Sequence, residues 1–160
     1  MLFRSHMEAQ FCLGNSYYNG EGVMEDYVEA VKWYRKAAEQ NYASAQSTLG
    51  LCYANGQGVA KDEVEAVEWY RKAAEQNNAH AQFNLGVCYY YGQGTTKDEA
   101  EAVKWFRKAA EQSHGQAQAN LGSCYLQGQG VMKDEVEAVK WYRKAAEHNL
   151  AFAQFGLGTC

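Results

Sequence analysis

The sequence predicts an all-α protein, an α-solenoid in which pairs of helices stack along the chain. The 160 residues include no proline, and alanine, glutamate, lysine, glutamine and tyrosine dominate the composition. Runs of β-branched residues at period two, the mark of strands, are absent. A Leu-Gly pair recurs at a constant step of 36 residues, which is the signature of a repeat array. The pairs begin at Leu13, Leu49, Leu85, Leu121 and Leu157.

The constant step divides the chain into repeats. The full repeats are 7–42, 43–78, 79–114 and 115–150, and a truncated fifth repeat occupies 151–160. Residues 1–6 are interpreted as a cloning remnant or an N-terminal extension. Because stacked repeats need polar caps at both ends, the uncapped C-terminal edge predicts a piece of a longer array and end-to-end self-association.

Each repeat contains two helical patterns. The first, as in 79–91, places apolar residues at i, i+4, i+7 and i+8, and it stops at a Gly-Gln-Gly turn at 92–94. The second, as in 98–112, begins with acids and has bases towards its end, which complements the helix dipole. Asp98 is expected to cap free backbone N–H groups at its start. The predicted buried stripe of this second helix consists of Val103, Phe106, Ala109 and Ala110.

Small residues predict how the helices approach each other. Gly86 lies in the middle of a predicted helix, where glycine costs about 1 kcal/mol relative to alanine. Its recurrence in every repeat predicts that a partner helix packs against its bare backbone. We expect Trp105 to be the large residue inserted among the alanines of the second helix, with Phe106 beside it.

The composition excludes several classes of function. A formal net charge of −4 gives no electrostatic case for nucleic acid. No run of about eighteen apolar residues suits a membrane span, and residues 1–7 do not form a secretory signal.

Metal-binding and catalytic chemistry are not predicted. Cys52, Cys88, Cys124 and Cys160 share one repeat position and are expected to be buried core thiols without disulfides, since equivalent helices lie too far apart. Cys12 is out of phase and expected to be exposed. No two of the four histidines stand at i and i+4 as a ligand pair would, and they are expected to be lone surface residues, so no metal or other cofactor is predicted. No nucleophile, base and orienting group come together, so the protein is predicted not to be an enzyme.

The repeat resembles the Sel1-like repeat family, a relative of the tetratricopeptide repeats. The resemblance rests on Ala-x-Ala-Gln-x-x-Leu-Gly-x-x-Tyr at 79–89, Gly-x-Gly at 92–94 and Lys-Asp-x-x-x-Ala-x-x-Trp-Phe-x-Lys-Ala-Ala at 97–110. It implies antiparallel helix pairs in a right-handed superhelix, with first helices lining a concave face, and a role as a protein adaptor. A cysteine-rich branch bridges each repeat with a second cysteine, which is alanine here, as at Ala74. This departure slightly favours a reducing compartment such as the cytoplasm.

The tetratricopeptide pattern suggests which first-helix residues would contact a ligand. These positions vary between repeats, as recognition positions can. The third repeat differs from the others because aromatic and polar side chains occur together at these positions. The side-chain amides of Asn84 and Asn120 could hold a peptide backbone. The candidate residues are Phe11, Asn15, Tyr18, Ser47, Leu51, His80, Phe83, Asn84, Val87, Tyr90, Tyr91, Asn120, Ser123 and Leu126.

The resulting prediction is a non-catalytic scaffold or adaptor that binds a protein or an extended peptide. One alternative is a synthetic consensus array without a native partner, because repeats two and four are identical at most positions. The other is an RNA-binding helical repeat, which the acidic charge and a groove poor in lysine and arginine disfavour.

Overall fold

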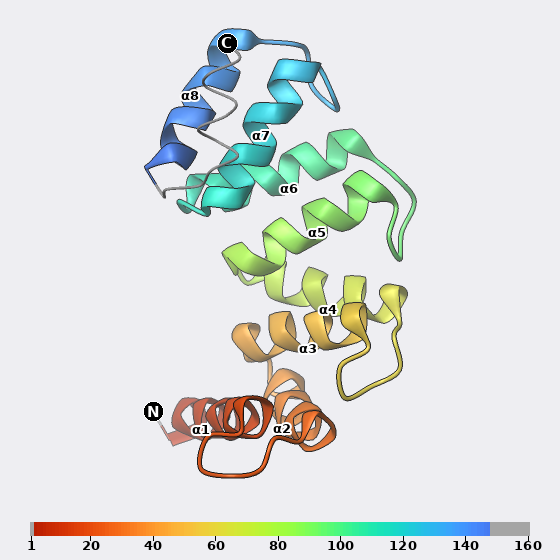
Figure 1. Cartoon of the computed structure of the whole chain (residues 1–160), viewed down its shortest axis with the longest axis vertical. Helices are drawn as coiled ribbons and strands as arrows, with labels where there is room; N and C mark the ends of the chain where they lie inside the picture. Colours follow the sequence, from red (N-terminus) through yellow and green to blue (C-terminus); the bar gives the residue numbers. More distant parts are fainter. Residues whose placement is uncertain (1, 148–160) are drawn as a thin grey trace. The chain divides into compact units, whose positions relative to one another are not determined.

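The computed structural model describes residues 2–147, with side chains from residue 6 onward. Within that range the chain forms eight α-helices and no strand (Figure 1). They are α1 (Leu2–Asn19), α2 (Tyr27–Glu39), α3 (Ala43–Asn55), α4 (Glu63–Glu75), α5 (Ala79–Tyr91), α6 (Glu99–Glu111), α7 (Gly115–Gln127) and α8 (Glu135–Ala146). The predicted all-α class and the helix pair in every 36-residue repeat are therefore confirmed. The predicted fifth repeat and its self-association edge lie outside the described residues.

The helices belong to two compact units, 1–78 and 79–160. In the first unit α1 packs on α2, α2 on α3 and α3 on α4. The second unit repeats this order with α5, α6, α7 and α8. Each unit thus holds two consecutive repeats, and each has its own buried core.

An aspartate side chain caps the start of the second helix in each described repeat. The carboxylate of Asp98 accepts a hydrogen bond from the backbone N–H of Glu101 at 2.9 Å, as predicted. Asp26, Asp62 and Asp134 do the same for their own helices. An aspartate cap of this kind stabilises a helix by about 1 kcal/mol relative to alanine.

The mid-helix glycines let the two helices of a pair approach closely. A Cβ atom added at Gly86 would lie 2.6 Å from the ring of Phe106 and 3.3 Å from the carbonyl oxygen of Ala102. The expected packing against a bare backbone is confirmed. The inserted ring, however, is Phe106, which is 1% exposed. The prediction of Trp105 was wrong, because that ring is only half-buried and lies under the ammonium group of Lys108.

The tryptophan N–H groups show a difference between repeats. In repeat two, the indole of Trp69 donates to Glu65 at 2.9 Å. Trp33, Trp105 and Trp141 have buried indole nitrogens with no hydrogen-bond partner. In those repeats the equivalent glutamate instead pairs with a lysine three residues on, as Glu101 does with Lys104 at 2.7 Å. Repeat two has Glu68 at the lysine position, which leaves Glu65 available to the indole.

We therefore expect Lys104→Glu to release Glu101 to the indole of Trp105. Satisfying a buried N–H group should raise the free energy of unfolding by about 1 kcal/mol, more than the exposed ion pair contributes. The direct readout is the indole N–H resonance of Trp105 in an NMR spectrum, which should move downfield. Glu68→Lys is the matched control and should shift the Trp69 resonance the opposite way. An unmoved Trp105 signal would contradict this account.

Candidate functional site

The candidate residues of the first unit are largely committed to contacts inside the unit. The side-chain carbonyl of Asn15 accepts a hydrogen bond from the Tyr34 hydroxyl at 2.9 Å. Tyr18 donates to Gln57 at 3.1 Å. Ser47 is buried, whereas Leu51 is 42% exposed. The ring of Phe11 packs against two tyrosine rings, those of Tyr34 and Tyr42.

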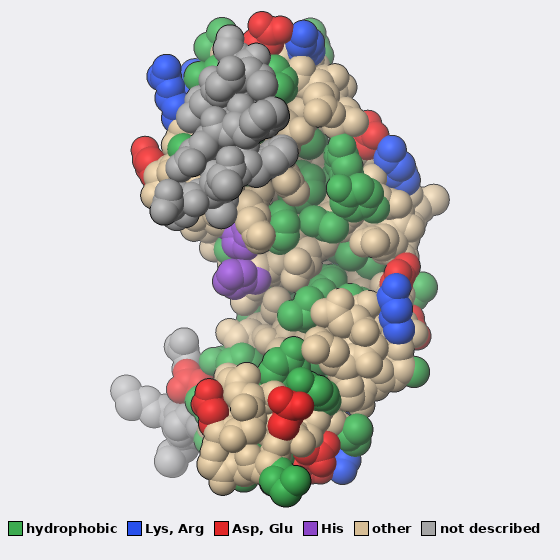
Figure 2. Space-filling view, in the orientation of Figure 1, with side chains coloured by type: hydrophobic (Ala, Val, Ile, Leu, Met, Phe, Trp, Pro, Cys, Tyr) green, Lys and Arg blue, Asp and Glu red, His purple; other side chains and the backbone are tan. Residues whose placement is uncertain are grey.

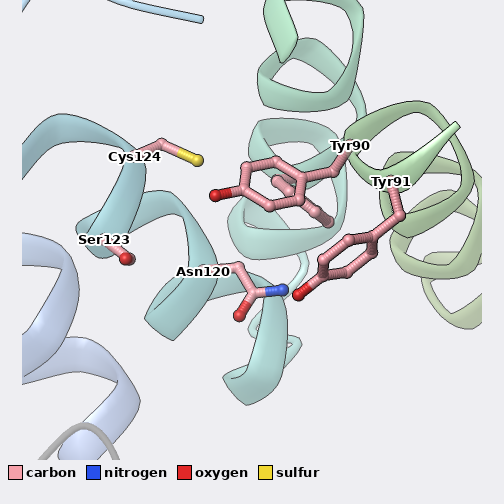
Figure 3. A pocket seen from close by; sticks show the side chains of 6 residues that line it. Tyr90, Tyr91, Asn120, Ser123 and Cys124 are labelled. Carbon is pink, nitrogen blue, oxygen red and sulfur yellow. The ribbon is translucent and has the colours of Figure 1, made fainter. Parts of the chain in front are cut away.

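In the second unit, four candidate residues meet around one pocket. It has a volume of about 140 Å³. The C-terminal turn of α5 contributes two of the residues, α7 contributes three and α6 contributes one (Figure 3). Its lining consists of Tyr90, Tyr91, Phe106, Asn120, Ser123 and Cys124. Phe106 and Cys124 were predicted only as core residues, so their part in the pocket was missed.

Two adjacent tyrosines form one wall of the pocket. The rings of Tyr90 and Tyr91 lie 4.9 Å apart at 79°, an edge-to-face arrangement. The Tyr90 hydroxyl donates to Gln129 at 2.6 Å, which holds this ring in place. Tyr91 is 67% exposed, and in Figure 3 its hydroxyl points towards the amide of Asn120. One wall is therefore fixed, while its rim is open to solvent.

One buried residue of the pocket lining is apolar because repeat three replaces a hydrogen-bonded pair. In repeat one, Tyr34 and Asn15 bond to each other. The equivalent residues of repeat three are Phe106 and Val87. Neither side chain carries a polar atom, so the ring beneath the pocket presents only carbon. Phenylalanine at a position that is tyrosine in the other repeats was the sequence signal for this apolar residue.

Burial favours the protonated forms of two ionisable groups in the pocket, the thiol of Cys124 and the hydroxyl of Tyr90. Burial raises the pKa of the Cys124 thiol to about 11, with a smaller contribution from the charge of Glu99. Burial is also the main cause that raises the pKa of Tyr90. A protonated thiol is a poor nucleophile, so the pocket offers binding surface without an activated group.

The other candidate residues of this unit do not line the pocket. Val87 and Leu126 pack partly buried against the core. The ring of Phe83 stacks on His114, with ring centres 4.8 Å apart. Asn84 is half-buried on α5 and does not line the pocket, so only Asn120 of the two asparagines is placed there.

Two histidines are in contact, which corrects the expectation of lone surface histidines. Nε2 of His114 lies 3.2 Å from Nδ1 of His80. Figure 2 shows histidine side chains, in purple, gathered on one face of the molecule. Nδ1 of His114 also accepts a hydrogen bond from the backbone N–H of Ala117 and so caps α7. Both bonds require His114 to be neutral with its proton on Nε2. A metal ion bound at Nε2 would displace this proton to Nδ1. Nδ1 could then no longer accept the hydrogen bond that caps α7.

The remaining cysteine and metal predictions concern the described part of the chain. Cys52, Cys88 and Cys124 are buried and Cys12 is exposed, as predicted. Cys52 and Cys124 form no disulfide, while Cys160 lies outside the described residues. Among residues whose side chains are described, no group of three or more metal-ligating side chains comes together. None of the described helices is long and apolar enough to cross a membrane.

Comparisons with known proteins place these features in a family. The family model of the Sel1 repeat matches residues 8–42, 43–78, 79–114 and 115–150 of this chain. A Sel1 repeat protein from Oxalobacter formigenes is 45% identical, with a TM-score of 0.90 over 98% of this chain and 65% of its own. The Escherichia coli protein c5321, described as a protective antigen of uropathogenic strains, is 40% identical, with a TM-score of 0.92 over 96% of this chain and 33% of its own.

Cysteine-rich protein B of Helicobacter pylori has the same fold at 26% identity and a TM-score of 0.64, over 81% of this chain and 92% of its own. This chain spans 65% of the length of the Oxalobacter formigenes protein and 33% of the length of c5321. A search among curated proteins gives no match. Sel1 repeats generally act as non-catalytic scaffolds for protein interaction, and no enzyme family is indicated. With four matched repeats covering most of its length, the chain belongs to the Sel1 repeat family.

Proposed function

We propose that this protein binds an extended segment of a partner protein across the first helices of its second unit. The observation that carries the proposal is the pocket between α5 and α7, on a face where Tyr91 is largely exposed. Tyrosine is enriched among the residues that dominate binding energy in protein interfaces, because it combines a large apolar area with a polar tip. The scaffold role typical of Sel1 repeats supports the same conclusion.

The second unit is better suited to this role than the first. In the first unit, the hydroxyl of Tyr18 and the amide of Asn15 are engaged in internal hydrogen bonds. In the second unit, Asn120 and Ser123 lie at a pocket beside an exposed aromatic ring. Polar groups at the edge of an apolar depression can orient a ligand while the depression supplies the contact area.

The test is Tyr91→Asn, which copies the asparagine that repeats one and two carry at this position. Proteins captured from lysate are identified by mass spectrometry, purified and titrated against wild type and variant. Loss of an interface tyrosine should weaken a true partner by about tenfold to a hundredfold. The unfolding temperature should stay the same, because the ring is mostly in solvent.

Met132→Asn is the matched control, since Met132 is 87% exposed and does not line the pocket. A partner that loses affinity with Tyr91→Asn and keeps it with Met132→Asn supports binding on this face. A partner that binds Tyr91→Asn as tightly as wild type would exclude the first-helix face of the second unit.

A further inference from the structure

We infer that the pocket between α5 and α7 accepts one uncharged side chain of the bound segment, of about the size of leucine, methionine or phenylalanine. The inference rests on the proposed function and specifies what a segment must carry to bind. It makes this pocket the position that sets which segments are recognised and in which register they lie.

The chemistry of the walls excludes charged side chains. The six lining residues include no lysine, arginine, histidine, aspartate or glutamate. The nearest cation over the wall is Lys97, whose ammonium group lies 6.0 Å from the Tyr90 ring centre and pairs with Glu99 at 2.8 Å. A carboxylate or ammonium group entering the pocket would lose its water without gaining an opposite charge. An uncharged side chain avoids this cost and can contact the rings of Tyr90 and Tyr91.

The size of the pocket sets the size of its occupant. A volume of about 140 Å³ is close to that of cavities of about 150 Å³ that hold a benzene molecule. An alanine side chain would leave most of this space empty and forfeit contact with the two tyrosine rings. Leucine, methionine and phenylalanine are large enough to fill it.

The polar edge suits the backbone beside such a side chain. The Tyr90 hydroxyl is already taken by Gln129. Asn120 and Ser123 lie on successive turns of α7 and both face the pocket in Figure 3. A side-chain amide can donate to a backbone carbonyl and accept from a backbone N–H, so Asn120 is placed to bind the main chain of an extended segment.

Repeat two, in the first unit, carries bulkier or branched residues at the equivalent positions. In repeat two the position of Ser123 is held by Leu51 and that of Asn120 by Thr48. Leu51 is 42% exposed in a first helix that packs stably in its unit. Ser123→Leu therefore copies a residue that the same scaffold already carries, and it should fill the pocket of the second unit without unfolding it.

The experiment selects ligands from a phage-displayed library of random peptides on the wild-type protein. The selected peptides should share one leucine, methionine or phenylalanine position. Replacing that residue with aspartate or lysine should weaken binding by about tenfold or more, the effect of leaving out one buried side chain. Ser123→Leu should weaken the unchanged peptide to a similar extent.

Met132→Asn, a change at an exposed residue that does not line the pocket, is the control and should leave affinity unchanged. Circular dichroism verifies folding, and Asn120→Thr gives a second variant if Ser123→Leu is unstable. If Tyr91→Asn weakens the peptides while Ser123→Leu or an aspartate anchor does not, the pocket inference is wrong and the proposed function stands. If no peptide is selected, or none responds to Tyr91→Asn, the proposed function fails and the inference fails with it.

Discussion

Gly130→Ala is expected to destabilise the second unit by about 3 kcal/mol or more. A Cβ atom at this position would lie 2.1 Å from the carbonyl oxygen of Glu99 and 2.8 Å from the backbone nitrogen of Ala100. Both atoms belong to the start of α6 in the preceding repeat. Because they are backbone atoms of a capped helix turn, they cannot move aside as the tip of a long side chain could. The turn of repeat four would have to separate from repeat three.

The measurement is urea unfolding followed by circular dichroism, and Gly22→Ala is the control. Gly22 and Gly130 have nearly the same left-handed conformation, with φ of 76° and 68°. Alanine therefore pays a similar conformational cost of about 1–2 kcal/mol at either site. No atom lies within 4 Å of a Cβ at Gly22, so the difference between the variants measures the contact between repeats. Equal losses of stability would show that the contact contributes nothing.

The helices of the fold were predictable because the residues that define them recur in each 36-residue repeat. Asp98 and Gly86 each occupy a recurring position whose physical requirement is local. One caps a helix start and the other leaves room for a neighbouring ring, and both roles were confirmed. The period could not rank Trp105 and Phe106, because adjacent residues on a helix differ in depth according to the shape of the partner helix.

The pocket was predictable in its rim and not in the part that Phe106 forms. Tyr90, Tyr91, Asn120 and Ser123 were predicted to face a ligand by comparison with the tetratricopeptide pattern of the first helices. Phe106 reaches the same space from the other helix of the pair, and spacing within one helix does not describe such a contact.

The contact of His80 with His114 was missed for a related reason. The two residues are 34 positions apart, two short of the period, so they share no repeat position. His114, however, is the last residue of repeat three and caps α7, and its ring there lies beside the start of α5, the first helix of its own repeat.

The second large effect expected is the destabilisation caused by Gly86→Ala, even though alanine is the better helix former by about 1 kcal/mol. The added Cβ would lie 2.6 Å from the Phe106 ring, which is almost fully buried and would have to shift to make room. Overpacking of this kind costs about 1–3 kcal/mol. At Gly122 the nearest ring atom, on Tyr142, would lie at 3.0 Å, so Gly122→Ala should be the milder change.

The cause can be separated from a general loss of helix packing by a double-mutant cycle. Phe106→Leu removes the ring edge that meets the new Cβ, and by itself it should destabilise the unit by leaving a cavity. In the Gly86→Ala background the same change should cost less, because the methyl group then occupies part of the vacated space. Residues in direct contact show coupling energies of about 0.5–3 kcal/mol. Additive losses in urea unfolding would mean that Gly86 is required for some reason other than the approach of Phe106. A favourable coupling would identify the ring against the bare backbone as the contact that sets the spacing of α5 and α6, and with it the depth of the pocket above Phe106.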